Sequence, residues 1–426
     1  DMKINRKILI IIGAAVLLVL AAVITFVSIG SRDKGIKIGF YGIDSATEDI
    51  FVELVKNSFE DEKKSPSISF EHLDKADSSV DLIVMPMGKI QDDLIATIES
   101  GKKKKPTLPI SVMSETTTSI RQKAVMLDGS VISVPLLTDN VEIEISLGAV
   151  AMTDTRQIQT WADIEKFASE SRQYYPYPIV FAGEDDETLL NVITALTEAY
   201  SGKDAYQEAL DSIREFLGKS EGDMDSGKIS ELLERLSQTP ESPLYAAAST
   251  LSRWIKSGLV HPGIFNMTKR DVEIYMENHY SSIVITSLSD HRSMTAQATK
   301  DFTTIPRALG NGGNSVGFFP SSRPASQRNL TGTVISALLL SKNSNSEKVV
   351  KAMLSQDFQA KLAYKTGLAP VNAQCQSPDI LSDDVRFFTA ATNAPLTPLG
   401  SAAFTSEDEA KAFTLELKSL IKTFRN

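Results

Sequence analysis

An uncharged apolar run near the start of the sequence constrains this chain more than any other feature. The run covers 22 residues, from Ile8 to Ile29, and follows three basic side chains. A helix of that length, rising about 1.5 Å per residue, spans the ~30 Å hydrocarbon core of a bilayer. Because basic flanks stay on the cytoplasmic side, residues 1–30 are predicted to form a cytoplasmic stub and a transmembrane anchor, with the rest exported.

Cleavage of this segment is the alternative. A cleavable signal peptide normally has a shorter apolar core of about 7–15 residues, yet Ser28-Ile29-Gly30 provides a small-x-small site. The single cysteine is Cys375, so no cysteine lies near the segment to accept a lipid. We therefore predict an uncleaved anchor.

Length and charge exclude several classes of protein. A chain of 426 residues exceeds one ordinary core and predicts two or three packed units. Lys and Arg number 44 against 54 Asp and Glu, for a net charge of −10. Residues 1–30 carry one acidic and three basic side chains, which leaves −12 on the exported part. This balance argues against binding to nucleic acid or to an anionic lipid surface, and one cysteine excludes an intramolecular disulfide framework.

The exported chain begins with alternating strand and helix patterns. Ile36–Phe40 has the pattern of a buried strand, and residues 80–85, apolar apart from Asp81, form a run of the kind that parallel sheets bury. Val131–Leu137 is a further strand, in which Pro135 indicates an edge or a crossover position. Helical patterns dominate after residue 145. This order predicts an α/β fold.

The sequence lacks the motifs of common catalytic sites. Its four histidines show no i, i+3 or i, i+4 metal spacing, and neither a GxxxxGK[ST] phosphate loop nor a GxSxG elbow is present. Ser287, Ser289, Asp290 and His291 lie together but have the pattern of a polar loop, since a catalytic triad is assembled across a fold. We expect no enzyme, no bound metal and no cofactor.

Five stretches follow one another in an order typical of one protein family. They are IKIGFYG (36–42), LDGSVISVPLLTDN (127–140), TWADIEKFA (160–168), LSRWIKSGLVHPGIFNMTKRDVEIYMENHYSSIVI (251–285) and LLLSKNSNSEKVVKAMLSQDFQAKLAYKTGLAPVNA (338–373). Together they resemble the extracellular solute-binding proteins of carbohydrate ABC importers, the maltose-binding-protein class. The last stretch is the most specific. The uncleaved anchor, in place of a lipidated cysteine, departs from that family.

The resemblance implies a two-lobed periplasmic-binding-protein fold with hinge-crossing strands. Residues 31–35 would be a linker after the anchor. The first lobe would comprise residues 36–139 and 284–343, and the second, helix-rich lobe residues 142–282 and 346–426. A ligand would bind in the cleft, at the carboxyl ends of strands, and the lobes would close around it by a hinge motion.

The resemblance also implies ligand contacts at ten positions, each of which can equally be read as a solvated strand end. Most of them come directly after a predicted strand. The positions are Tyr41, Asp44, Met87, Asp139, Glu184, Asp185, Thr286, Ser287, Ser289 and Thr333.

Aromatic platforms for sugar rings are scarce in this sequence. Trp161 and Trp254 are the only tryptophans, and both fall in helices whose pattern predicts core packing. Tyr174, Tyr175 and Tyr177 could supply a platform, or could lie in a surface loop before a strand.

The resemblance and the anchor together imply a membrane-tethered, extracytoplasmic solute-binding protein. It would be a single-pass protein of the cytoplasmic membrane that captures a small polar, carbohydrate-like ligand for ABC permease subunits, with no role for nucleic acid. The alternative is an anchored ligand sensor, or a structural partner in another membrane assembly, that keeps the fold without transport.

Overall fold

The structure, a computed structural model, describes most of the chain after the predicted anchor. The described residues are 35–60, 66–101, 105–154, 158, 161–219, 224–304, 331–376 and 395–424. The predicted anchor and residues 31–34 of the predicted linker lie outside them. Among the helices of the described ranges, none combines the length and the apolar character needed to cross a membrane.

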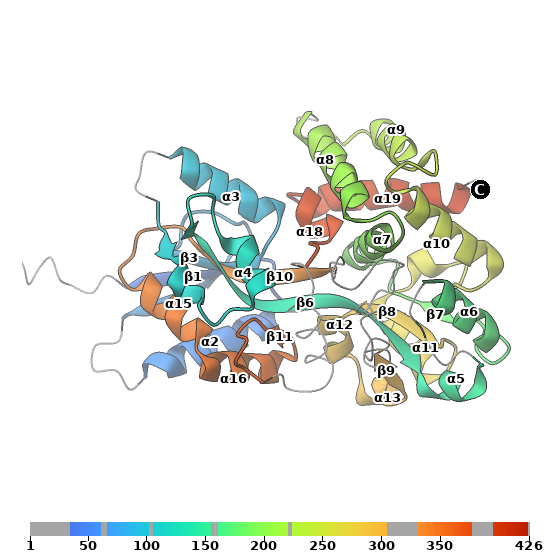
Figure 1. The fold of residues 1–426 in the computed structure, drawn as a ribbon, viewed down its shortest axis with the longest axis horizontal. Coiled ribbons are helices and arrows are strands. Elements are labelled where there is room, and N and C mark those ends of the chain that lie inside the picture. The colour runs from blue at the N-terminus through green and yellow to red at the C-terminus, as the bar shows by residue number, and fades with distance from the viewer. Residues whose placement is uncertain are drawn as a thin grey trace, which may run out of the picture.

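One mixed sheet runs through both lobes of the molecule (Figure 1). The main strand order is β2 (Ile68–His72), β1 (Ile36–Phe40), β3 (Leu82–Pro86), β10 (Gly332–Leu339), β6 (Ser133–Ser146), β8 (Ile283–Ser287) and β7 (Ile179–Val180). Two further short strands, β11 (Ala369–Pro370) and β9 (Phe302–Thr304), pair with β6.

Strand β6 joins the two lobes. Its first half pairs with β10, from Ser133 to Asn140, and its second half pairs with β8, from Val141 to Ile145. The sequence pattern at Pro135 indicated either an edge or a crossover position. The structure places Pro135 in the crossover strand, beside a register shift in β10. The missing N–H of proline is tolerated at such an irregularity.

The first lobe packs helices on both faces of its strands. Helices α2 (Ser45–Phe59), α15 (Ser346–Leu354) and α16 (Gln356–Thr366) lie together on one face, where the rings of Phe51 and Phe358 are 6.4 Å apart. Helix α3 (Lys89–Ser100) packs on the other face. Successive side chains of β3 alternate between the two cores, as expected for a strand buried on both sides.

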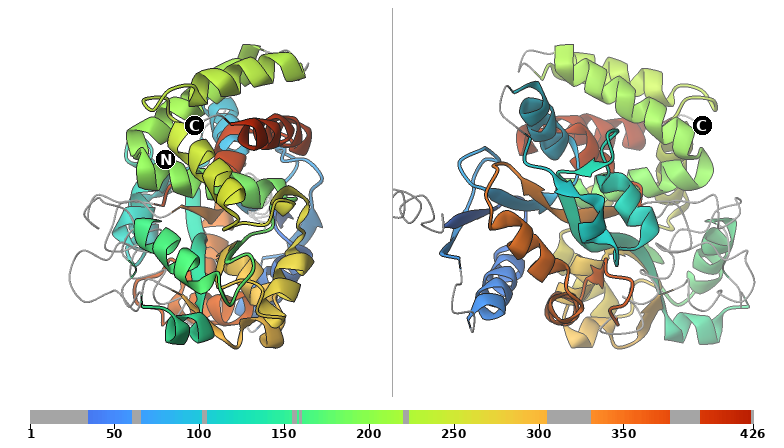
Figure 2. Two further views of the ribbon diagram at one scale, coloured as in Figure 1. Left: turned by 90° about the vertical axis from the view of Figure 1, so that its right-hand side faces the viewer. Right: turned by 60° about the vertical axis from the view of Figure 1, so that its left-hand side comes forward.

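The second lobe is built mainly from helices, as its sequence pattern predicts. Its core is formed around α7 (Asp186–Tyr200) and α10 (Tyr245–Ser257), which pack together and against α19 (Glu407–Thr423). Figure 2 shows this helical layer from two further directions. The remaining elements are α5 (Leu147–Met152), α6 (Trp161–Ser171), α8 (Lys203–Lys219), α9 (Ser226–Ser237), α11 (Lys269–Glu277), α12 (Leu288–Ser293), α13 (Ala296–Thr299) and α18 (Leu399–Ala403).

Strand pairing divides the chain differently from the expected lobe boundaries. Residues 283–287 and 302–304 pair with the second half of β6, whereas residues 284–343 were expected in the first lobe. Helices α15 and α16 pack on α2, although residues 346–426 were expected in the second. The described residues thus group as 35–139 with 332–376, and as 141–304 with 395–424.

Candidate functional site

A hollow of about 570 Å³ lies between the two lobes, and we call it the acidic hollow. Its first-lobe wall comes from the ends of β1 and β3, and its second-lobe wall from the starts of α7 and α19. Open α/β sheets bind ligands at such strand ends. The lining includes Tyr41, Gly42, Met85, Pro86, Gly88, Ile90, Asp185, Asp186, Glu187, Leu190, Ser401, Phe404, Glu407, Asp408 and Lys411.

Helix starts explain why the second-lobe wall is acidic. Asp185 caps α7 by accepting a hydrogen bond from the Thr188 backbone N–H at 2.7 Å. Asp186 and Glu187 follow in the first turn, and α19 begins with Glu407. Negative side chains favour these positions because of the helix dipole. The result is a group of carboxylates that line the hollow and can accept hydrogen bonds from ligand hydroxyl groups, although Asp186 already accepts from the Thr414 hydroxyl at 2.6 Å and lies 3.1 Å from the Lys418 ammonium.

Two side chains in the acidic hollow have shifted pKa values. Burial, and then the nearby Glu407 carboxylate, raise the pKa of Tyr41. The pKa of Glu187 is raised to about 7 by the protein around it and by the carboxylates of Asp139 and Asp185, although its side chain remains open to solvent.

Asp139 stands at the crossing of the lobes. It accepts hydrogen bonds from the Ser289 backbone N–H at 3.0 Å and from the Ser289 hydroxyl at 2.5 Å. The Ser289 hydroxyl is also 3.0 Å from that of Ser287, the N-cap of α12. Burial raises the pKa of Asp139 to about 6, against the opposing effect of the Ser289 hydrogen bonds.

The raised pKa of Asp139 predicts a pH-dependent contribution to stability. Because the folded-state pKa lies above the unfolded one, this contribution is complete below about pH 4 and is lost as the pH rises through about 6. Between those values we expect the wild type to lose on the order of 2 kcal/mol relative to Asp139→Asn. Thermal unfolding of both proteins across pH 4–8 measures this difference. A stability difference between the wild type and Asp139→Asn that stays constant across this pH range would contradict the raised pKa of Asp139.

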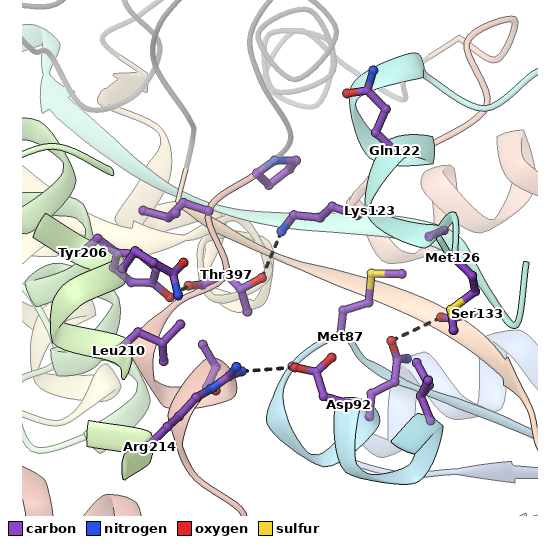
Figure 3. Close-up of a pocket in the computed structure, with 18 of the residues that line it drawn as sticks. Met87, Asp92, Gln122, Lys123, Met126, Ser133, Tyr206, Leu210, Arg214 and Thr397 are labelled. Atoms are coloured by element: carbon purple, nitrogen blue, oxygen red, sulfur yellow. Dashed lines mark hydrogen bonds and ion pairs between the residues drawn. The ribbon is translucent and has the colours of Figure 1, made fainter. Parts of the chain in front are cut away.

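A second hollow of about 480 Å³ adjoins the first, and we call it the mixed-charge hollow (Figure 3). In it the Lys123 ammonium donates to the Thr397 hydroxyl at 2.9 Å, and the Arg214 guanidinium lies 3.1 Å from the Asp92 carboxylate. Both contacts join the first lobe to the second. Burial lowers the pKa of Lys123 to about 8.

Gly88 separates the two hollows and lines both of them. A Cβ atom at this position would lie 2.1 Å from the Ser401 backbone oxygen and 2.8 Å from its carbonyl carbon. Main chain of one lobe thus touches main chain of the other. Only glycine allows this approach.

The structure spreads the ten expected contact residues over several places. Tyr41 and Asp185 line the acidic hollow, and Met87, which is 7% exposed, lines the mixed-charge hollow. Asp139, Ser287 and Ser289 come together at the crossing, as described above.

The other four expected residues have different surroundings. Thr333 pairs with Asp139 in the β10–β6 ladder, and Thr286 is buried opposite Glu142. Glu184 is exposed in an adjoining depression that shares Asp185, Asp186 and Lys411 with the acidic hollow, and its backbone oxygen accepts a hydrogen bond from Lys418. Asp44 caps α2 by accepting from the Thr47 backbone N–H at 2.9 Å, which gives it a structural role.

The aromatic residues singled out from the sequence lie away from the two hollows. Trp254 is fully buried, and its indole N–H donates to Glu165 at 2.9 Å. Tyr175 is buried, Tyr174 is half exposed, and Tyr177 packs edge-on against His261. The side chain of Trp161 lies outside the described residues.

Sequence reasoning missed Glu187, Glu407, Lys123 and Arg214. Glu187 carried a usable signal, because it lies in the first turn of a helix that follows strand β7, near the strand ends. Glu407 begins α19, which follows helix α18 rather than a strand, so it carried only the signal of a helix start. The two basic residues carried none, since each looks like an ordinary residue of an amphipathic helix.

Comparison with known proteins gives no match of the sequence to a protein-family model or to a curated protein. Solved structures do match the fold. The bacterial solute receptor AcbH, described as specific for β-D-galactopyranose, has a TM-score of 0.64 at 13% identity, with 92% of this chain and 94% of that chain covered.

Two other structures agree with this match. The binding protein MsmE from Bacillus subtilis has a TM-score of 0.61 at 10% identity, covering 91% of this chain and 92% of its own. A sugar transporter protein from Bacillus licheniformis, in complex with stachyose, has a TM-score of 0.56 at 11% identity, covering 92% and 96%. The two-lobed architecture, the crossing strand and these neighbours show that the chain has the fold of the sugar-type solute-binding proteins of ABC importers.

Proposed function

We propose that this protein captures a small polar solute between its lobes and presents it without chemical change. The observation that supports this most is the acidic hollow, which is formed by both lobes at the ends of β1 and β3. Its volume is typical of a site for a small ligand. Hinge movement at β6 would let the solute enter and leave.

The charge of the acidic hollow favours a neutral, hydroxyl-rich ligand. Asp185, Asp186, Glu187 and Glu407 present acceptors for hydroxyl groups and would repel an anion. Three structural neighbours are described with β-D-galactopyranose, stachyose or chitin oligosaccharide. A mono- or oligosaccharide is therefore the ligand class we propose, held mainly by carboxylates.

Membrane tethering and transport complete the proposal. The apolar run of residues 8–29 supports a single-pass anchor, with the folded part on the extracytoplasmic side. ABC permease subunits would then be the partners that receive the solute. Digestion of intact protoplasts by an external protease should remove the folded part, and protection from that protease would contradict the orientation.

A second candidate function is a tethered sensor or structural partner without transport. The contacts Arg214–Asp92 and Lys123–Thr397 already hold the lobes together across the mixed-charge hollow. A protein whose lobes stay in this arrangement would act as a sensor or as a structural partner, and would not pass solute to a permease.

Thermal unfolding against a panel of compounds tests whether the protein captures a solute. The full chain in detergent micelles is heated with sugars, polyols, amino acids and oligopeptides. A ligand at 100 times its dissociation constant adds about 2.7 kcal/mol to stability, which shifts the midpoint measurably. We expect a selective shift with a saccharide. No shift with any compound, from a protein that unfolds cooperatively, would contradict solute capture and favour the structural role.

A further inference from the structure

Two glutamates are buried side by side on the crossing strand. Glu142 and Glu144 stand two positions apart on β6, so their side chains emerge on the same face, and both are 0% exposed. Burying a charged carboxylate is costly unless it is paired and hydrogen-bonded. Such an arrangement therefore needs a compensating group.

His291 faces both carboxylates from α12. Its Nδ1 atom contacts the Glu144 Oε1 atom and lies 3.4 Å from the Glu142 Oε1 atom. One ligand atom from each of the three residues lies within 4.8 Å of the other two. Two ligand atoms at about 2.1 Å from one ion are at most about 4.2 Å apart, so a small side-chain movement would close the group around an ion.

Hydrogen bonding leaves this group incomplete. Both carboxylate oxygens of Glu142 and one of Glu144 are buried without a hydrogen-bond partner among the described residues. The fully buried amide of Asn140, two positions earlier on β6, also has no hydrogen-bond partner there. Native structures rarely leave so many buried polar atoms together unless water, a ligand or an ion completes them.

Arg292 adds a positive charge near this group. Its positive charge acts on Glu142 and opposes the rise in pKa that burial and the Glu144 carboxylate cause. Its Nε–H, however, donates to the Gly367 backbone oxygen at 3.2 Å.

We propose that Glu142, Glu144 and His291 bind a divalent transition-metal ion, Zn²⁺ or Mn²⁺. Two carboxylate oxygens and one imidazole nitrogen form a donor set that suits such ions, whereas Mg²⁺ and Ca²⁺ prefer oxygen ligands alone. A charge of +2 neutralises the two carboxylates. This site is separate from the acidic hollow.

The ion would hold α12 against β6 where the chain crosses between the lobes. Helix α12 carries His291 and also Ser289, which donates two hydrogen bonds to Asp139. Binding an ion between α12 and β6 would hold Ser289 in place at the crossing of the lobes. The role is structural and needs no chemistry at the metal.

Calorimetric titration of the full chain tests the proposal. The protein is stripped with a chelator in detergent micelles and titrated with ZnCl₂, MnCl₂ or MgCl₂. We expect one Zn²⁺ or Mn²⁺ per chain, at least about tenfold tighter than Mg²⁺, and a raised unfolding midpoint. Glu142→Gln and His291→Gln should each weaken binding by about tenfold or more.

The chain provides a matched control in another Glu–His pair. Glu48 and His72 are in contact at 2.8 Å on the surface of the first lobe. Glu48→Gln and His72→Gln should leave the binding unchanged. Equal binding in the His291→Gln protein, or no binding of either ion to the wild type, would overturn the proposal. If the Glu142→Gln protein fails to fold, metal binding by the His291→Gln protein alone tests the proposed site.

Discussion

Replacing Gly88 by alanine will weaken ligand binding by about tenfold or more, equivalent to about 1.4 kcal/mol, because the added methyl group keeps the lobes apart. Its Cβ atom would lie 2.1 Å from the Ser401 backbone oxygen, a contact between two main chains that no side-chain rotation relieves. The lobes must then separate, and a ligand held by both loses one wall of its site. The measurement is the ligand-induced shift in unfolding midpoint.

Gly218→Ala is the matched control for this substitution. Gly218 lies near the end of α8, and a Cβ atom there would have no neighbour within 4 Å. We expect unchanged ligand binding and a small gain in stability from better helix propensity. In the Gly88→Ala protein, hydrogen exchange should also increase near residues 87–92 and 395–404. Unchanged binding and exchange would show that the Gly88–Ser401 contact does not limit closure.

Replacing Trp254 by alanine will lower the free energy of unfolding by about 3–5 kcal/mol. Trp254 is fully buried on α10, and its indole N–H donates to Glu165 on α6. The substitution leaves a large cavity and removes a hydrogen bond that joins the two helices. Denaturant unfolding of the full chain measures the loss.

Leu415→Ala is the control for the size of that effect. Leu415 lies on α19 in the same lobe, and its side chain is 65% exposed. Its replacement should change stability by no more than about 0.5 kcal/mol. Similar losses from both substitutions would contradict the assignment of Trp254 to the core.

Much of the fold could be predicted from local patterns. Apolar runs identified β1 and β3, and Pro135 indicated an unusual position in its strand. The second half of β6 could not be found in this way, because Asp139, Glu142 and Glu144 look like loop residues. They are buried only because β8, β9 and α12 come from 140 to 160 residues later in the chain.

The candidate site was harder to predict than the fold. Tyr41 and Asp185 follow strands and line the acidic hollow, whereas Asp44 follows a strand and caps a helix instead. Local sequence cannot distinguish these two roles, because a helix cap and a ligand contact use the same side chains. The proposed metal ligands show no motif, since a strand and a distant helix contribute them.

Hydrogen–deuterium exchange tests the central claim most directly. The full chain in detergent micelles is labelled with and without a mixture of mono- and oligosaccharides, and exchange is followed by mass spectrometry. A ligand bound between the lobes should slow exchange in both lobes: near residues 40–44 of the first, and near residues 185–190 and 404–411 of the second. Protection confined to one lobe, or no protection in a protein that unfolds cooperatively, would contradict binding in the cleft.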